Sequence, residues 1–85
     1  MRVWKPSAEE LKQTEQWGDW SKEASEFPWF YSEPETCYIL DGEAVVTDKN
    51  GSEIQFKRGD MVHFEQGVEC TWKIVRDIRK KYLFG

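Results

Sequence analysis

Apolar and polar residues alternate with a period of two over most of the chain beyond residue 26, and turn residues separate the alternating segments. Such alternation is typical of β-strands with one buried face. The pattern predicts strands at residues 27–31, 35–40, 43–47, 54–57, 61–64, 70–75 and 78–84. Many short strands joined by tight turns favour an all-β sandwich or barrel.

The turns between these strands are rich in glycine, proline and short polar residues. Ser32-Glu33-Pro34 follows the first strand, Asp41-Gly42 separates the second from the third, and Asn50-Gly51 closes a hairpin loop. Asn and Gly tolerate the positive φ that tight hairpins need. We therefore expect residues 35–40 and 43–47 to be separate strands joined at Asp41-Gly42.

The N-terminal segment carries a helix signal in place of the alternation. Ser7 and Glu10 have the spacing of a capping box, and Glu9 and Glu10 fall where the helix dipole favours negative charge. This predicts a short helix over residues 8–16, ended by Gly18-Asp19. It has too few apolar positions to be stable alone, so we expect a flap packed against a larger unit.

Length and charge limit the function classes. The chain has 85 residues, enough for one domain with one core, and 39% of them are apolar. A net charge of −4 gives no overall basic field, so no nucleic-acid partner is predicted. No apolar run has the length of a membrane span, and the N-terminus lacks the apolar stretch of a signal peptide, so no membrane partner is predicted and the expected location is the cytoplasm.

Two groups of residues call for a chemical interpretation. Arg76, Arg79, Lys80 and Lys81 gather near the C-terminus, and we expect them to form the solvated face of the last strand, with an anion or an acidic partner as the functional alternative. Cys37 and Cys70 are too few for a disulfide framework and are expected to be free thiols.

The glycine spacing resembles that of the cupin superfamily. Glu35 is followed after six residues by Gly42, and Gly59-Asp60 is followed by Gly67, three positions before Cys70. The segments ETCYILDGE and KRGDMVHFEQGVECTWKI look most similar to the small single-domain cupins related to ureidoglycine aminohydrolase and an ethanolamine-utilisation protein. The resemblance implies a single jelly-roll barrel with a short N-terminal helix, a pocket at one mouth and often a homodimer. The expected division is a strand/helix flap at 1–26 and the cupin β-barrel at 27–85.

The resemblance also implies a metal site of three His and one Glu, which this sequence lacks. The Glu of the motif falls on Glu35, the first two His fall on Pro28 and Phe30, and the third falls on Cys70. The one histidine of the chain, His63, is seven residues away from that third position. No metal and no other cofactor is therefore predicted. Zinc held by two thiolates and Glu35, or thiol chemistry at a cysteine, stays open as an alternative.

The candidate ligand pocket consists of Glu35, Cys37, Cys70, Trp72 and Phe30. Glu35 is the best candidate for a catalytic group, because a carboxylate inside an apolar barrel must be hydrogen-bonded, paired or protonated. Its expected partners are Arg76, Arg79 or a backbone amide. By strand alternation, His63 is expected to face outward together with Met61, away from Val62 and Phe64.

Three functions follow from these observations. The first is binding of a small molecule in the pocket, without the His metal site. The second is a metal-dependent enzyme of the aminohydrolase type that uses Glu35 with cysteine ligands. The third is a dimeric interaction module with a filled barrel. Whether the chain is an enzyme stays open, and a homodimer is expected in each case.

Overall fold

The computed structural model describes residues 1–85 as seven antiparallel strands of one sheet and one helix. The elements are β1 (Arg2–Trp4), α1 (Ala8–Thr14), β2 (Gly18–Lys22), β3 (Ser25–Phe30), β4 (Glu35–Asp48), β5 (Glu53–Lys57), β6 (Met61–Phe64) and β7 (Glu69–Phe84). The all-β fold class is confirmed.

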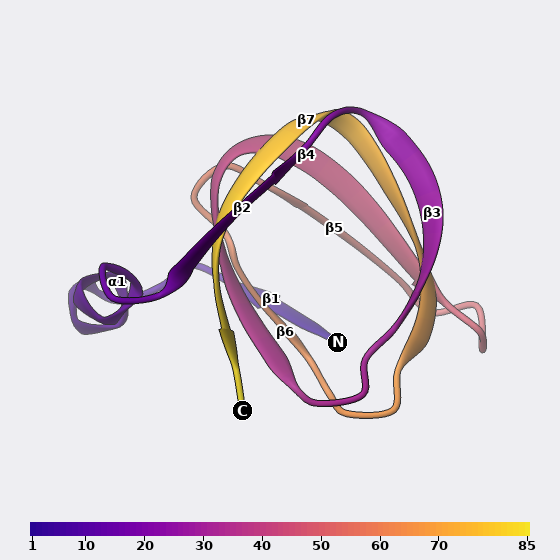
Figure 1. Cartoon of the computed structure of the whole chain (residues 1–85), viewed down its shortest axis with the longest axis horizontal. Helices are drawn as coiled ribbons and strands as arrows, with labels where there is room; N and C mark the ends of the chain where they lie inside the picture. Colours follow the sequence, from indigo (N-terminus) through magenta and orange to yellow (C-terminus); the bar gives the residue numbers. More distant parts are fainter.

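The strands wrap around a common interior, and α1 lies outside them to one side (Figure 1). The hydrogen-bonded order is β1-β6-β4-β7-β2, while β3 pairs with β7 and β5 pairs with β4. The two long strands β4 and β7 pair with each other along most of their length and so form the centre of the sheet. Side chains on the concave side of these two strands form the core together with residues of β5, β6 and the segment after β3.

The helix begins as the sequence predicts. Ser7 is the N-cap, its hydroxyl accepts from the backbone N–H of Glu10, and the Glu10 carboxylate accepts from the N–H of Ser7. The hydrogen bond from the Ser7 backbone is the main reason that the pKa of Glu10 is lowered. This reciprocal capping explains why a helix of only seven residues forms here. No helix of the chain is long and apolar enough to cross a bilayer.

The expected turn at Asp41-Gly42 is wrong, because the chain continues through it as one strand with an irregular register. The buried residues of β4 are the odd-numbered Glu35, Cys37 and Ile39 before this point and even-numbered residues after it. Gly42 has φ 93°, and a Cβ there would lie 2.3 Å from the carbonyl oxygen of Asp77. Glycine therefore permits a bulge that bends the strand and reverses its inward face.

The sequence predicts a strand in the N-terminal flap without giving its position, and the structure contains two. β1 pairs with β6 and β2 pairs with β7, so both join the sheet that the later strands form. The expected break at Gly18-Asp19 is instead the start of β2. The predicted strands at 70–75 and 78–84 are likewise one strand, β7. Its backbone stays paired with β4 through Arg76 and Arg79, although the register shifts there.

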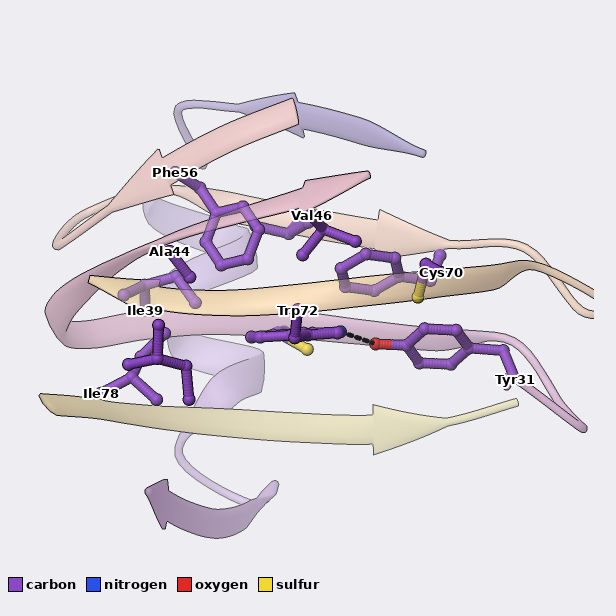
Figure 2. Close-up of a cluster of buried hydrophobic side chains, with 12 residues drawn as sticks. Tyr31, Ile39, Ala44, Val46, Phe56, Cys70, Trp72 and Ile78 are labelled. Carbon is purple, nitrogen blue, oxygen red and sulfur yellow. Dashed lines mark hydrogen bonds between the residues drawn. The ribbon is translucent and has the colours of Figure 1, made fainter. Parts of the chain in front are cut away.

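The core is a cluster of buried apolar residues dominated by aromatic rings. Trp72, Phe56, Phe64 and Tyr31 are each no more than 2% exposed, and their ring centroids lie 4.6–6.4 Å apart where they pack. Figure 2 shows the Trp72 indole N–H donating to the Tyr31 hydroxyl oxygen, at 3.1 Å. Large rings let this small domain bury much area per residue.

Strand β6 corrects one expectation and confirms another. Val62 and Phe64 belong to the core, and His63 faces the other way, where its Nδ1 lies 2.9 Å from Thr36 Oγ1. Met61, expected to be exposed beside His63, is only 1% exposed. Met61 pairs with Trp4 on one side and Tyr38 on the other, and cross-strand neighbours share a face, so two large rings flank it.

Candidate functional site

A pocket of about 540 Å³ opens on the inner side of the sheet. This volume lies within the range typical of small-molecule sites. Its lining is mainly apolar and aromatic, and comes from β2, β3, β4, β7 and the residue after β3: Trp20, Lys22, Phe27, Pro28, Trp29, Tyr31, Glu35, Trp72, Lys80, Tyr82 and Phe84. Only three of these residues carry a charge, and two of them lie buried together.

The buried charges are an ion pair between Glu35 of β4 and Lys80 of β7. Lys80 Nζ lies 2.7 Å from Glu35 Oε2, and the side chains are 7% and 5% exposed. Cys37, two residues after Glu35 on the same face, donates its S–H to the same Oε2 at 2.8 Å. Lys80 also donates to Cys37 Sγ at 3.4 Å. Glu35, Cys37 and Lys80 form a connected polar group that we call the buried triad.

Two indole rings complete the surroundings of the Lys80 ammonium. Its Nζ lies 4.7 Å from the ring centroid of Trp20 and 4.9 Å from that of Trp72. Such contacts stabilise a cation electrostatically, and more so where water is excluded. Lys80 is therefore held as a cation by a carboxylate and two aromatic faces, and the negative charge of Glu35 is compensated in place.

One oxygen of Glu35 stays without a partner inside the chain. Both hydrogen bonds to this carboxylate end on Oε2, and none reaches Oε1. No buried side-chain nitrogen or oxygen lacks a hydrogen-bond partner. Glu35 Oε1 is therefore an atom that solvent can reach, and since Glu35 lines the pocket, this oxygen is an acceptor available to a bound molecule.

Tyr31 supplies a donor close to the same place. Its hydroxyl oxygen accepts from Trp72, so its own proton is free to donate, and Tyr31 lines the pocket. Burial, followed by the negative charge of Glu35, raises the pKa of Tyr31 far above its ordinary value. The phenol therefore stays protonated at every physiological pH and can donate a hydrogen bond.

The sequence-predicted pocket residues do not all lie together. Glu35 and Trp72 line the pocket. Cys37 is fully buried within the triad, and Cys70 is 7% exposed with its Sγ 3.6 Å from the Trp29 carbonyl oxygen. Cys70 pairs with Asp48 in the register and Cys37 pairs with Tyr82, so the two thiols lie at different ends of the β4–β7 ladder.

Phe30 is outside the pocket, contrary to the prediction. It is 55% exposed and pairs with the exposed Glu69, whereas its neighbour Trp29 pairs with the buried Cys70. Since cross-strand partners share a face, the inward residue of β3 at this level is Trp29, and the inward side chain that follows is Tyr31. Of the two positions on which the first two His of the cupin motif fall, Phe30 therefore faces away from the interior, whereas Pro28 lines the pocket.

Lys80 is the functional residue that the sequence interpretation missed. We expected Glu35 to pair with Arg76, Arg79 or a backbone amide, and assigned Lys80 to a solvated face. Arg76 instead lies 3.3 Å from Glu43 in a more exposed pair. In the continuous strand β7, Lys80 has the same even parity as the buried Cys70, Trp72 and Ile74. This signal was not available while residues 70–75 and 78–84 were expected to be separate strands. Trp20 was missed because β2 was not predicted.

A cupin metal ion does not fit this site. Trp29 of β3 and Tyr31 just after it line the pocket, and the ammonium of Lys80 already occupies the neighbourhood of the Glu35 carboxylate. Burial raises the pKa of the Cys37 thiol, and Cys70 lies elsewhere. No group of three or more His, Cys, Asp or Glu side chains is placed to hold a metal ion. A metal cation at the Glu35 carboxylate would be repelled by the Lys80 ammonium.

Both thiols are expected to react slowly in the folded chain, because burial disfavours the thiolate. Burial, and then the charge of Asp48, raises the pKa of Cys70 to about 11, so its labelling by an aromatic disulfide reagent should accelerate as pH rises toward that value. Cys37, which is 0% exposed, should react only after unfolding. A Cys70→Ser variant isolates Cys37 for the comparison. Rapid labelling of either thiol at neutral pH without denaturant would contradict this expectation.

Comparison with known families and structures agrees with the architecture. Residues 9–82 match the model of the EutQ-like cupin domain family. A crystal structure of a DUF861 family protein from Thermotoga maritima superposes with a TM-score of 0.95 at 42% identity, covering 99% of this chain and 98% of that one. A search of curated proteins gave no match.

Two ethanolamine-utilisation proteins share the fold at lower identity. The EutQ protein of Clostridium difficile superposes with a TM-score of 0.72 at 18% identity, and covers 79% of this chain and 52% of its own. A putative ethanolamine utilization protein Q of Salmonella typhimurium gives 0.71 at 24% identity, with 79% and 54% covered. This chain spans about half the length of those two proteins, and the likeness to them is one of fold.

Proposed function

The chain belongs to the EutQ-like cupin domain family, and from this premise we propose that it is a small cupin that binds one small organic molecule in the pocket above Glu35 and Lys80. In this proposal the seven-stranded sheet closes into the cupin jelly-roll barrel, with the pocket at one mouth. The two free buried thiols suit a reducing cytoplasm, where we place the protein.

The observation that carries the proposal is the free carboxylate oxygen of a residue only 4% exposed, at the base of an aromatic pocket. A buried charged group normally has its hydrogen-bonding capacity used, because desolvation without compensation is costly. Here Glu35 lines a volume large enough for a ligand and keeps one carboxylate oxygen without a partner. If these residues served only for packing, we would expect other side chains to fill this volume.

A thermal-shift screen with a panel of small organic fragments tests the proposal. A fragment present at a hundred times its Kd stabilises the folded chain by about 2.7 kcal/mol, which raises Tm by about 10–20 °C in a domain of this size. The ligand-induced shift should be lost in Trp20→Ala, which opens the pocket wall, and kept in the matched control Trp4→Ala, outside the pocket. Each shift is measured from the variant's own Tm. A panel with no stabilising fragment, or equal shifts in both variants, would overturn the proposal.

The metal-dependent enzyme is less well supported, because its ligand set would have to include a carboxylate already paired with Lys80. Metal analysis of the purified chain separates this alternative. One tightly held equivalent of a transition metal, removed by Cys37→Ser, would favour the enzyme over the binding protein. Loss of the metal in a Cys70→Ser variant would favour the enzyme equally.

We expect a two-fold homodimer in solution. β1 and β2 end the strand order, and β3 and β5 each pair on one side only, so four strands present an unpaired edge. Phe30, Leu83 and Phe84 are each about half exposed beside such edges. Small sheets protect edges of this kind by association. Sedimentation analysis at tens of micromolar checks the expectation, and a single monomeric species there would contradict it.

A further inference from the structure

Resting on the proposed binding function, we propose that the pocket selects an uncharged ligand with an N–H beside a carbonyl oxygen, such as a primary carboxamide or a lactam. The amide group would lie at the base of the pocket, at Glu35 Oε1 and the Tyr31 hydroxyl. An apolar, preferably flat, body would lie against the rings above it. The inference combines the charge balance, the hydrogen-bonding groups and the walls of the pocket.

The charge balance at the base disfavours an ion of either sign. Glu35 and Lys80 lie 2.7 Å apart, so a cationic ligand attracted by the carboxylate is repelled by the ammonium beside it. An anionic ligand attracted by the ammonium is likewise repelled by the carboxylate. A charged ligand would also lose its hydration on entering an apolar pocket, without a full counter-charge to replace it. A neutral ligand avoids both costs.

The hydrogen-bonding groups left free at the base are complementary to an amide. Glu35 Oε1 can only accept, and the Tyr31 hydroxyl, which already accepts from Trp72, can donate. Lys80 has three N–H groups, of which two are used by Glu35 and Cys37. One acceptor beside one or two donors matches a ligand that presents one N–H and one C=O side by side.

The third charged residue in the lining is Lys22, which differs from the other two. It is an exposed residue of the edge strand β2, and its Nζ lies 5.1 Å from the ring centroid of Phe27. An exposed ammonium is screened by solvent and salt, so it adds little to selectivity at the base. A ligand with a negative group far from its amide could still reach Lys22, and the experiment includes this case.

The walls favour a flat apolar body. Phe27 and Trp72 are stacked with an interplanar angle of 13°, and Trp20 meets Trp72 edge-on at 65°. All three rings line the pocket, so a bound ring can contact both aromatic faces and edges. Rigid rings keep this shape without a large loss of conformational entropy on binding.

Three probes of nearly equal shape test the inference: benzamide, which is neutral, benzoate and benzylammonium. Isothermal titration calorimetry of the full chain at neutral pH should give benzamide a Kd at least about tenfold lower than either ion, from the desolvation cost of the charge. Binding of an ion at equal or higher affinity overturns the amide inference while the binding function stands. No saturable binding of any probe up to millimolar concentration overturns both.

Two variants with a matched control refine the test. Tyr31→Phe removes the pocket hydroxyl and should weaken benzamide binding about fivefold, the effect of one hydrogen bond. Tyr38→Phe, on the opposite face of β4, is the control and should bind benzamide as the unmodified chain does. Equal affinities in both variants would overturn the role of Tyr31. If benzoate binds best and loses its advantage in Lys22→Gln, the rim lysine selects the ligand and the inference is wrong.

Discussion

Replacing Lys80 with methionine is expected to lower the free energy of unfolding by about 3–5 kcal/mol, the cost of leaving a buried charge without its partner. Methionine keeps the long apolar stem that packs against Trp20 and Trp72, so the loss isolates the ammonium. Glu35, with a side chain only 5% exposed, would lose its counter-charge and one of its two hydrogen bonds. Urea denaturation of the purified variant measures the effect.

A second substitution distinguishes charge from packing. Adding Glu35→Gln to Lys80→Met removes the unpaired charge and should recover a large part of the lost stability, because replacing both members of a buried pair costs less than removing one. Lys81→Met is the matched control, since Lys81 pairs with a largely exposed Asp19 and should change stability by less than about 1 kcal/mol. If Lys80→Met were as mild as this control, the buried triad would not have the energetic role assigned to it.

Truncation of Trp72 to alanine is expected to cost about 3–5 kcal/mol and to abolish ligand binding. Trp72 is 2% exposed, packs against Phe27, Phe56 and Phe64, and donates its indole N–H to Tyr31. Its loss leaves a cavity in the centre of the core and removes one wall of the pocket. Thermal and urea unfolding measure the stability, and calorimetry measures the binding.

Two comparisons keep this prediction specific. Trp29→Ala, which truncates a ring that is 50% exposed at the rim, should cost far less stability. Trp72→Phe retains an aromatic wall and should lose less stability than Trp72→Ala. A Trp72→Ala chain that unfolds at the same urea concentration as Trp29→Ala would show that the ring cluster does not carry the stability.

The alternation of side chains made much of the fold predictable. It placed Cys70 and Trp72 inside, and Val62 and Phe64 opposite His63, because a buried face imposes a period of two. It did not show that β4 and β7 are continuous, since Gly42 reads as a turn residue whether the chain reverses there or bulges. Only the close approach of the Asp77 carbonyl to Gly42 distinguishes these outcomes, and Asp77 is distant from Gly42 in the sequence.

The short strands β1 and β2 could not be predicted for a related reason. They have three and five residues, and each forms by pairing with a strand some 60 residues further along the chain. Strand preference depends on such partners more than on the local sequence. Because Trp20 lies on β2, the sequence did not reveal one of the two indole rings that contact the Lys80 ammonium.

The site itself was predictable in part. The need of Glu35 for a partner followed from elementary electrostatics. The partner Lys80 was not identified, because residues 70–75 and 78–84 were expected to be separate strands and Lys80 stands in a run of basic residues. The error at Phe30 has a simple cause, since shifting a strand by one residue exchanges its two faces. Spacing within a motif did not fix the register of β3, whereas its pairing with β7 does.

The most direct test of the central claim, that the pocket above Glu35 and Lys80 is a ligand site, is an NMR titration of the ¹⁵N-labelled chain with benzamide. We expect saturable shifts of the indole N–H signals of Trp20 and Trp72, which line the pocket, while the signals of Trp4 and Trp17, outside it, stay in place. Shifts that do not saturate, or that appear at Trp4 and Trp17 and leave the two pocket indoles unmoved, would contradict it.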